Sequence, residues 1–339
     1  MIPHGFLRRA CGGLMKGDIC VIEVKHLTKR YGGHTAVSDL SFTIEPGQIY
    51  GFLGPNGAGK STTMNIITGC LGATDGEVNV DGHSVMDDPI EAKRCIGYLP
   101  ELPPLYTDMT PLEYLCLVLK MKGVKRSEWD KQLRSVMDRT KLHDVKDRLI
   151  GNLSKGYRQR VGIAQALLGN PKVIILDEPT VGLDPAQIIE IRELIKSLGR
   201  DHTVILSSHI LSEVQAVCDQ IMIIAHGKLV ASDTADNLTS LMASGSKTAI
   251  TVRASIEETE AVLAGMDGLE SADYKMNDEG ETTVRILPKD GEDICAKLFF
   301  AFAQAGLPIL EMKRERATLE DVFLELTQDD HADQEVTGA

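Results

Sequence analysis

The sequence predicts an α/β protein in which helices cover a largely parallel sheet, followed by a smaller α+β domain. A glycine-rich segment, residues 54–62, lies between a short apolar strand and a helix. Apolar strands return at residues 173–176, 203–207 and 221–224 with helical stretches between them, an alternation that is typical of a parallel sheet. Beyond residue 247 the elements follow the order strand, helix, strand, strand, helix, strand.

The first part of the chain leads into the glycine-rich segment through two strands and a turn. Residues 20–24 and 41–44 alternate apolar and polar side chains, as half-buried strands do. Residues 45–48 contain Pro and Gly and are predicted to turn, and residues 49–53 form an apolar strand that runs into the glycines. Residues 60–70 then have the pattern of a helix.

The middle of the chain changes to a helical pattern. Thr110, Pro111 and Glu113 form a good helix start, because Thr caps the helix, Pro suits its first position and Glu its third. Helical periodicity returns around residues 129–137. We therefore predict a mostly helical insertion at about residues 95–168.

A run of small residues, 243–246, marks a domain boundary. We assign residues 19–243 to the first domain and residues 247–327 to a second one, whose split βαβ order is ferredoxin-like. The remaining expectations are a last short helix at residues 319–326, a disordered N-terminal extension at residues 1–18 (with a start near Met15 as the alternative) and a disordered tail at residues 328–339.

Composition and charge disfavour several classes of function. No stretch approaches the roughly 18 to 20 apolar residues that a membrane span needs, so a pore would have to come from another chain. The net charge is −13, and residues 246–339 alone hold 21 acidic and 9 basic side chains. Such an excess of carboxylates disfavours a nucleic-acid groove, which needs clustered Lys and Arg, and we predict no nucleic-acid partner.

The cysteines are scattered singly, form no C-x-x-C pair and lack the spacing of metal ligands. Buried thiols in a reducing cytosol are the simplest interpretation. The seven are Cys11, Cys20, Cys70, Cys95, Cys116, Cys218 and Cys295.

Residues 54–62 match the phosphate-binding pattern G-x-x-x-x-G-K-[ST]. The glycines let successive N–H groups point into one concavity at a helix N-terminus, which binds nucleotide phosphates. Lys60 adds a cation for the outer phosphates, and the Ser61 hydroxyl can ligate Mg²⁺. The alternative, a glycine-rich turn that binds nothing, would not need the strand and helix on either side. The predicted nucleotide-binding residues are Gly54, Pro55, Asn56, Gly57, Ala58, Gly59, Lys60, Ser61 and Thr62.

Asp177 and Glu178 close an apolar strand. Adjacent carboxylates are costly at the end of a buried strand unless something compensates their charge, and a Mg²⁺ ion would do so. We expect Asp177 to hold the metal and Glu178 to orient and deprotonate the attacking water. The alternative is a pair of solvated acids at a strand end.

The order of five motifs resembles the ATPase subunit of ATP-binding-cassette (ABC) transporters, closely so over residues 20–240. In that family the first motif is called Walker A and the third Walker B, and the resemblance implies a P-loop ABC cassette that binds ATP with Mg²⁺. The motifs are residues 54–62, Leu153-Ser154-Lys155-Gly156-Tyr157, residues 173–178, residues 182–185 and Ser207-Ser208-His209.

The second motif resembles the family signature LSGGQ and departs from it at Lys155 and Tyr157. In the family this loop meets the γ-phosphate held by the other subunit, which implies a head-to-tail homodimer. The residues implied to act in trans are Leu153, Ser154, Lys155, Gly156 and Tyr157. Asp184 matches the D-loop, which links the two sites of such a dimer. Taken alone, a helix-capping Ser followed by an ordinary loop would look similar.

Three further residues take roles from the resemblance. His209 matches the switch histidine that contacts γ-phosphate, and Tyr31 lies where the family stacks an aromatic ring on adenine. A structural His at a strand end and a surface Tyr in a turn are the plainer alternatives. Glu101 stands where the family's Q-loop carries Gln, next to Mg²⁺ and the lytic water. It can accept a hydrogen bond or ligate the metal, but it cannot donate an N–H.

The resemblance also implies partners. Residues 316–323 look like part of the small domain that follows many exporter-type ATPases whose permease is a separate chain, and residues 102–106 with the helical insertion are where the family docks that permease. The implied location is the cytoplasmic face of the plasma membrane. Two alternatives remain: a soluble ABC protein acting on nucleic acid or the ribosome, which the single cassette and the acidic C-terminal part disfavour, and an ATP sensor that hardly turns over.

Overall fold

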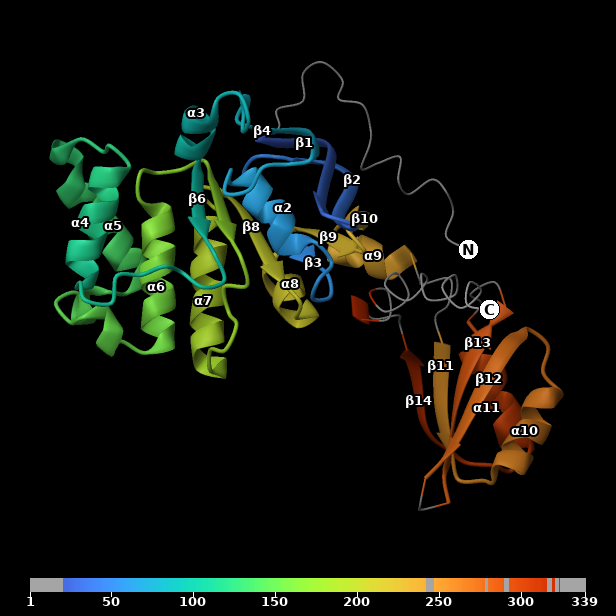
Figure 1. The fold of residues 1–339 in the computed structure, drawn as a ribbon. Helices are drawn as coiled ribbons and strands as arrows, with labels where there is room; N and C mark the ends of the chain where they lie inside the picture. Colours follow the sequence, from blue (N-terminus) through green and yellow to red (C-terminus); the bar gives the residue numbers. More distant parts are fainter. Residues whose placement is uncertain are drawn as a thin grey trace. The chain divides into compact units, whose positions relative to one another are not determined.

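The computed structural model describes residues 21–241, 247–277, 280–289, 293–315, 319, 320 and 323 (Figure 1). The chain divides into two compact units between Thr234 and Ala235. This division lies ahead of the boundary expected at residues 243–246. The expected terminal segments lie outside the described residues, and so does most of the expected helix at residues 319–326.

A six-stranded sheet forms the centre of the first unit. The strands β3, β8, β9, β7 and β6 pair in parallel, and only β10 pairs antiparallel, with β9. All residues of β3 and β7 are buried, as expected of strands that are covered on both faces of the sheet. The order across the sheet is β10 (Lys228–Asp233), β9 (Gln220–Ala225), β3 (Ile49–Leu53), β8 (Thr203–Ser208), β7 (Val173–Leu176) and β6 (Ile96–Leu99).

A second, antiparallel sheet packs against the first through a shared hydrophobic core. Phe42 of the second sheet meets Phe52 of β3 edge to face, with ring centroids 5.4 Å apart. Helix α2 (Lys60–Ile67) contributes Met64 and Ile67 to the same core. The order of this sheet is β2 (His34–Ile44), β1 (Ile22–Tyr31), β4 (Asp75–Val80) and β5 (His83–Ser84).

The helical insertion begins as its sequence predicts. Thr110 caps α4 by accepting a hydrogen bond from the Glu113 N–H, and the Glu113 carboxylate accepts one from the Thr110 N–H. Residues 96–99, at the start of the expected insertion, are strand β6 of the central sheet, so the helical part begins at Pro111. Helices α4, α5 and α6 contact one another, and Figure 1 shows them at one end of the sheet, beside β6. Their bounds are α4 (Pro111–Met121), α5 (Trp129–Thr140) and α6 (Lys155–Leu167).

The remaining helices of the first unit connect strands. They are α3 (Pro89–Arg94), which precedes β6, α7 (Pro185–Leu198), which runs between β7 and β8, and α8 (Leu211–Val217), which runs between β8 and β9. Short 3₁₀ turns at Arg126–Glu128, His143–Val145 and Ile150–Asn152 complete the connections.

In the described part of the second unit, β11 to β14 form a four-stranded antiparallel sheet, and with α10 and α11 they follow the strand–helix–strand–strand–helix–strand order expected from the sequence. Helix α10 starts at a capping box formed by Ser255 and Glu258. Phe302 and Leu298 of α11 pack against the sheet. The elements are α9 (Ala235–Leu241), β11 (Lys247–Val252), α10 (Ile256–Ala264), β12 (Leu269–Met276), β13 (Thr282–Pro288), α11 (Cys295–Gln304) and β14 (Ile309–Glu315), and the sheet order is β12-β13-β11-β14.

Candidate active site

The glycine-rich segment forms the loop between β3 and α2. Gly57 and Gly59 have φ angles of 84° and 104°, in the region that favours glycine. A Cβ on Gly59 would come within 2.6 Å of the Ala36 carbonyl oxygen, and one on Gly54 within 2.3 Å of the Ile224 carbonyl oxygen. These glycines therefore let the loop fold closely against β2 and β9 at the N-terminus of α2.

Lys60 turns its side chain back over the loop. Its Nζ donates to the carbonyl oxygens of Gly54 and Pro55, at 2.8 and 3.2 Å, and lies 3.8 Å from Glu178 Oε1. Burial lowers the Lys60 pKa from its usual value, while the carboxylates of Glu178, Asp177 and Glu101 act in the opposite direction. An anionic ligand beside Lys60 would favour its charged form further.

Asp177 lies just past the end of β7, where β7 and β8 run side by side. Its Oδ1 accepts hydrogen bonds from Ser61 Oγ, at 3.1 Å, and from Ser207 Oγ, at 2.6 Å. The carboxylate and the Ser61 hydroxyl are hard oxygen ligands in contact, so this pair fits a Mg²⁺ ion. The structure therefore brings Ser61 of the Walker A segment to Asp177 of the Walker B strand.

Glu178 is held in an unusual backbone conformation. Its φ is 48°, in the left-handed region that Glu rarely adopts. The Glu178 N–H donates to Ser207 Oγ at 2.8 Å, and His209 Nδ1 lies 3.0 Å from Glu178 Oε2. These contacts point the Glu178 carboxylate toward Lys60. The Glu178 side chain is only 8% exposed to solvent.

A cavity of about 420 Å³ lies over these groups. It brings together the Walker A residues, Glu178, His209 and Glu101, which come from distant parts of the chain. Glu101 follows β6 and is exposed to solvent. The lining residues are Ala36, Asn56, Gly57, Gly59, Lys60, Ser61, Thr62, Glu101, Glu178, Val181 and His209.

Tyr31 does not line this cavity. It ends β1 and is 49% exposed, with Lys29 Nζ lying 5.2 Å from the centre of its ring. Tyr31 pairs with His34 at the start of β2, the strand that carries Ala36 into the cavity wall. An adenine-stacking role for Tyr31 stays a prediction.

The signature segment begins helix α6. Ser154 is the N-cap residue and accepts a hydrogen bond from the Tyr157 N–H, while Leu153 is buried. Lys155 and Gly156 pack against the segment around the D-loop: a Cβ on Gly182 would come within 2.3 Å of Lys155 Nζ, and one on Gly156 within 2.5 Å of Gln187 Oε1.

Asp184 caps the next helix, α7, by accepting a hydrogen bond from the Gln187 N–H at 2.9 Å. All of residues 153–157 and Asp184 are described, and none of them lines the cavity above Lys60.

Sequence reasoning missed the polar support behind the carboxylates. Ser207 was noted only as a neighbour of His209, yet its hydroxyl bonds both Asp177 and the backbone of Glu178. Buried Glu213 accepts from Ser208 Oγ at 3.2 Å and from the hydroxyl of Thr180, which follows Glu178 in the chain. No local pattern in the sequence identifies Ser207, because it reaches Asp177 only through the parallel pairing of β7 with β8, which places the ends of the two strands together.

A glycine loop, a buried lysine and a Glu178 carboxylate that line one cavity, with Asp177 bonded to Ser61 beside it, define a phosphate-binding ATPase of the P-loop class. The sequence model of the family described as "ABC transporter" matches residues 37–181. The bacitracin transport ATP-binding protein BcrA of Bacillus licheniformis is 34% identical over 90% of this chain and 97% of its own length. The chain therefore belongs to the ATP-binding proteins of ABC transporters, and it is an ABC-type ATPase.

Other relatives agree with this assignment. The linearmycin resistance ATP-binding protein LnrL of Bacillus subtilis (strain 168) is 32% identical over 91% of this chain and 98% of its own length. Among solved structures, the dimeric bacterial ABC transporter cassette MJ0796 is 29% identical and covers 63% of this chain and 98% of its own, with a TM-score of 0.58. A post-hydrolysis state of the same cassette is bound to ADP and Pi. In the part of the chain that the structure describes, no helix combines the length and apolar character needed to cross a membrane.

Proposed function

We propose that this ATP-binding subunit powers export through a separately encoded membrane permease by ATP-driven, head-to-tail dimerisation of two copies. The observation that carries the proposal is the separation of its two sets of motifs. One cavity gathers Lys60, Glu178 and His209, whereas residues 153–157 and Asp184 lie outside its lining. A second subunit would bring its own signature segment to this cavity and complete the site.

In this mechanism the β- and γ-phosphates of ATP lie on the loop of residues 54–62 and on Lys60. Lys60 Nζ would exchange its bonds to the Gly54 and Pro55 carbonyls for phosphate oxygens.

Ser61 and Asp177 would hold Mg²⁺, which supplies neutralisation of charge on the transferring phosphoryl group. Ser207 fixes the Asp177 carboxylate through a 2.6 Å hydrogen bond and so keeps it close to the Ser61 hydroxyl. Tyr31 is proposed to stack on adenine, since its ring is half exposed at the end of β1.

Glu178 is the proposed general base. The left-handed backbone and the bond from the Glu178 N–H to Ser207 fix where the carboxylate points, and His209 contacts its Oε2. His209 would also contact the γ-phosphate. Glu101 at the cavity wall would accept a hydrogen bond from the attacking water or ligate Mg²⁺, the role that Gln has in the family.

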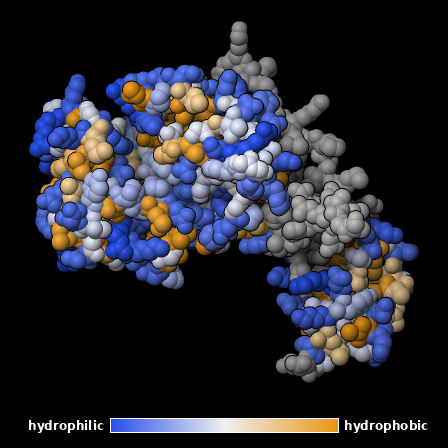
Figure 2. All heavy atoms as spheres, in the orientation of Figure 1, coloured by the Kyte–Doolittle hydropathy of each residue, from blue (hydrophilic) through white to orange (hydrophobic). Residues whose placement is uncertain are grey.

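Export and a separate permease are proposed from the relatives. The names of two full-length relatives describe bacitracin transport and linearmycin resistance. Exposed apolar side chains lie after β6 and on the insertion, with Leu102 82% exposed and Met121 74% exposed. On the face of the first unit that Figure 2 draws, apolar residues lie in small groups among polar ones. We propose that a permease docks there, holding the protein at the cytoplasmic face of the membrane.

The experiment compares ATP hydrolysis by the purified wild type with hydrolysis by Glu178→Gln, while light scattering follows the oligomeric state. Loss of the general base is expected to lower the rate at least about 100-fold. ATP binding should persist, and the variant should accumulate as an ATP-dependent dimer. A variant that binds ATP with Mg²⁺ but stays monomeric at every protein concentration would overturn the dimer mechanism.

A further inference from the structure

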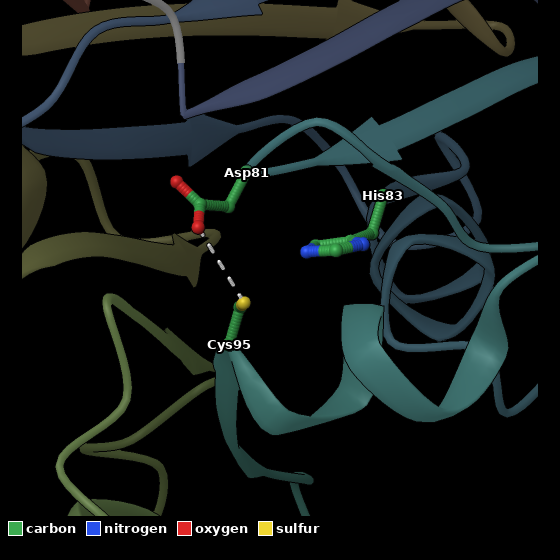
Figure 3. A group of neighbouring side chains, drawn as sticks. All are labelled: Asp81, His83 and Cys95. Atoms are coloured by element: carbon green, nitrogen blue, oxygen red, sulfur yellow. Dashed lines mark hydrogen bonds between the residues drawn. The ribbon is translucent and has the colours of Figure 1, made fainter.

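Three side chains of types that can ligate a metal ion lie close together outside the lining of the cavity above Lys60. Asp81, His83 and Cys95 each offer one ligand atom, and these atoms all lie within 4.8 Å of one another (Figure 3). Cys95 Sγ is 3.7 Å from Asp81 Oδ2. None of the three residues lines the cavity above Lys60.

The local fold explains why these residues meet. Asp81 and Gly82 form the tight turn between β4 and β5, both with positive φ, at 49° and 81°, a conformation that is typical of an Asp-Gly hairpin. The turn places Asp81 and His83 on either side of Gly82. Cys95 is the C-cap residue of α3 and precedes β6 directly.

We propose that Asp81, His83 and Cys95 bind a Zn²⁺ ion that ties the β4–β5 hairpin to the start of β6. One sulfur, one nitrogen and one oxygen ligand form a mixed set that suits Zn²⁺, whereas Mg²⁺ and Ca²⁺ prefer oxygen alone. Ligand atoms around a tetrahedral Zn²⁺ stand about 3.3 to 3.8 Å apart. The distance between Cys95 and Asp81 already falls in this range.

The orientation of His83 supports the site. Its Nδ1 lies 2.7 Å from Asp88 Oδ2, so Nε2 is the nitrogen left for a metal. Figure 3 shows one ring nitrogen pointing toward the space between Asp81 and Cys95. A carboxylate on the far nitrogen of a ligating histidine fixes the ring and raises its basicity, as in many zinc sites.

Two competitors set the conditions for binding. Lys172 Nζ lies 2.6 Å from Asp81 Oδ2, and its side chain is 63% exposed, so it can move away from the carboxylate. Burial and the nearby Asp81 raise the pKa of the Cys95 thiol, so the metal must displace a proton from sulfur.

The test uses full-length protein without a polyhistidine tag, stripped with a chelator and free of nucleotide. Zn²⁺ is titrated in competition with a chromogenic chelator. The wild type should bind one Zn²⁺ per chain more than Cys95→Ser or His83→Gln. Lys172→Gln should bind Zn²⁺ more tightly than the wild type, because it removes the competing cation. Titration with Co²⁺ should give a thiolate charge-transfer band in the wild type that Cys95→Ser lacks.

Cys70→Ser is the matched control, since Cys70 is an exposed thiol outside the group. It should keep the wild-type stoichiometry and the Co²⁺ band. Any Zn²⁺ bound beside Ser61 and Asp177 would be the same in the wild type and in the variants. The difference in stoichiometry between them therefore reports only Zn²⁺ bound by Asp81, His83 and Cys95. Equal Zn²⁺ stoichiometry and affinity in the wild type, His83→Gln and Cys95→Ser would overturn the proposal. His83→Gln keeps the test valid if Cys95→Ser fails to fold.

Discussion

The start of α2 and the starts of α6 and α7 satisfy their backbone N–H groups in different ways. Ser154 and Asp184 cap α6 and α7 with their own side chains. Helix α2 begins at Gly59, which provides no side-chain cap. Because the first N–H groups of a helix need partners, an uncapped start is ready for a phosphate. The comparison distinguishes a helix terminus built to hold a ligand within one chain from termini that are complete without one.

The charged side chains of the cavity and those of the signature segment and D-loop also differ, in how far they are exposed to solvent. Lys60, Asp177 and Glu178 are each less than a tenth exposed, whereas Lys155 and Asp184 lie at the surface. Charges with so little contact with water are costly unless they are compensated. A polyphosphate with its metal ion would compensate the first set, and the second set needs no such ligand to be stable.

The largest expected effect comes from Lys60→Met. Affinity for ATP should fall at least about 100-fold, or about 2.7 kcal/mol, because charge-assisted hydrogen bonds to phosphate are lost. The free energy of unfolding without nucleotide should fall much less, because the cost of burying the ammonium, which lowers the Lys60 pKa, offsets much of what its hydrogen bonds contribute. Nucleotide titration and thermal unfolding check both statements.

Lys228→Met, at an exposed position, is the control for Lys60→Met and should change neither quantity. A Lys60→Met protein that is much less stable without ATP would contradict the proposed difference between the two regions. Lys60 would then stabilise the fold itself rather than serve to bind a ligand.

Ser154→Ala tests the region assigned to the partner. ATP binding by the monomer should stay within about twofold, whereas steady-state hydrolysis should fall about tenfold or more, since the γ-phosphate contact in trans is lost. Loss of the N-cap should cost about 1 kcal/mol of stability. Ser255→Ala removes an equivalent cap from α10 and is the matched control for stability alone. Equal hydrolysis rates in Ser154→Ala and Ser255→Ala would show that Ser154 only caps its helix and takes no part in hydrolysis.

Ser207→Ala tests the support behind the carboxylates. It leaves the buried N–H of Glu178 without its partner, which should cost about 1 to 3 kcal/mol of unfolding free energy. Hydrolysis should fall as well, because the Asp177 carboxylate loses its shortest hydrogen bond. Chemical denaturation and ATPase assays measure the two effects. Ser197→Ala removes a hydroxyl that bonds only within its own helix and should leave hydrolysis unchanged.

Glu101→Gln should have the smallest effect. Its side chain is exposed at the cavity wall, and Gln keeps a carbonyl oxygen for water or Mg²⁺. Hydrolysis should stay within about tenfold of the wild type, which corresponds to about 1.4 kcal/mol in the activation barrier. Complete loss of activity would show that the carboxylate itself is required.

The sequence predicted best those elements whose signals are local. The start of α4 at Thr110 agrees with the structure because its capping box defines the helix start within a few residues. The cluster of Lys60, Glu178 and His209 could be expected from the order of the motifs.

What the sequence did not show depends on contacts between distant segments. Strand β6 was taken into the helical insertion, because its four residues are a strand only through pairing with β7. Ser207 lies 30 positions from Asp177, and only the parallel pairing of β7 and β8 makes them neighbours. Asp81 and Cys95 likewise meet through the fold, so the spacing of the cysteines gave no indication of a metal site.

Lys155 and Gly156 pack against Gly182 and Gln187, and this contact links the signature segment to the D-loop. In the proposed dimer, the signature segment would meet the partner's γ-phosphate and the D-loop would run toward the partner's site. Because the two segments lie in close contact, we expect them to move together. In the proposed dimer neither ATP could leave its site without disturbing the contacts of the other. We therefore expect the two sites of the proposed dimer to hydrolyse ATP cooperatively, with a Hill coefficient between about 1 and 2.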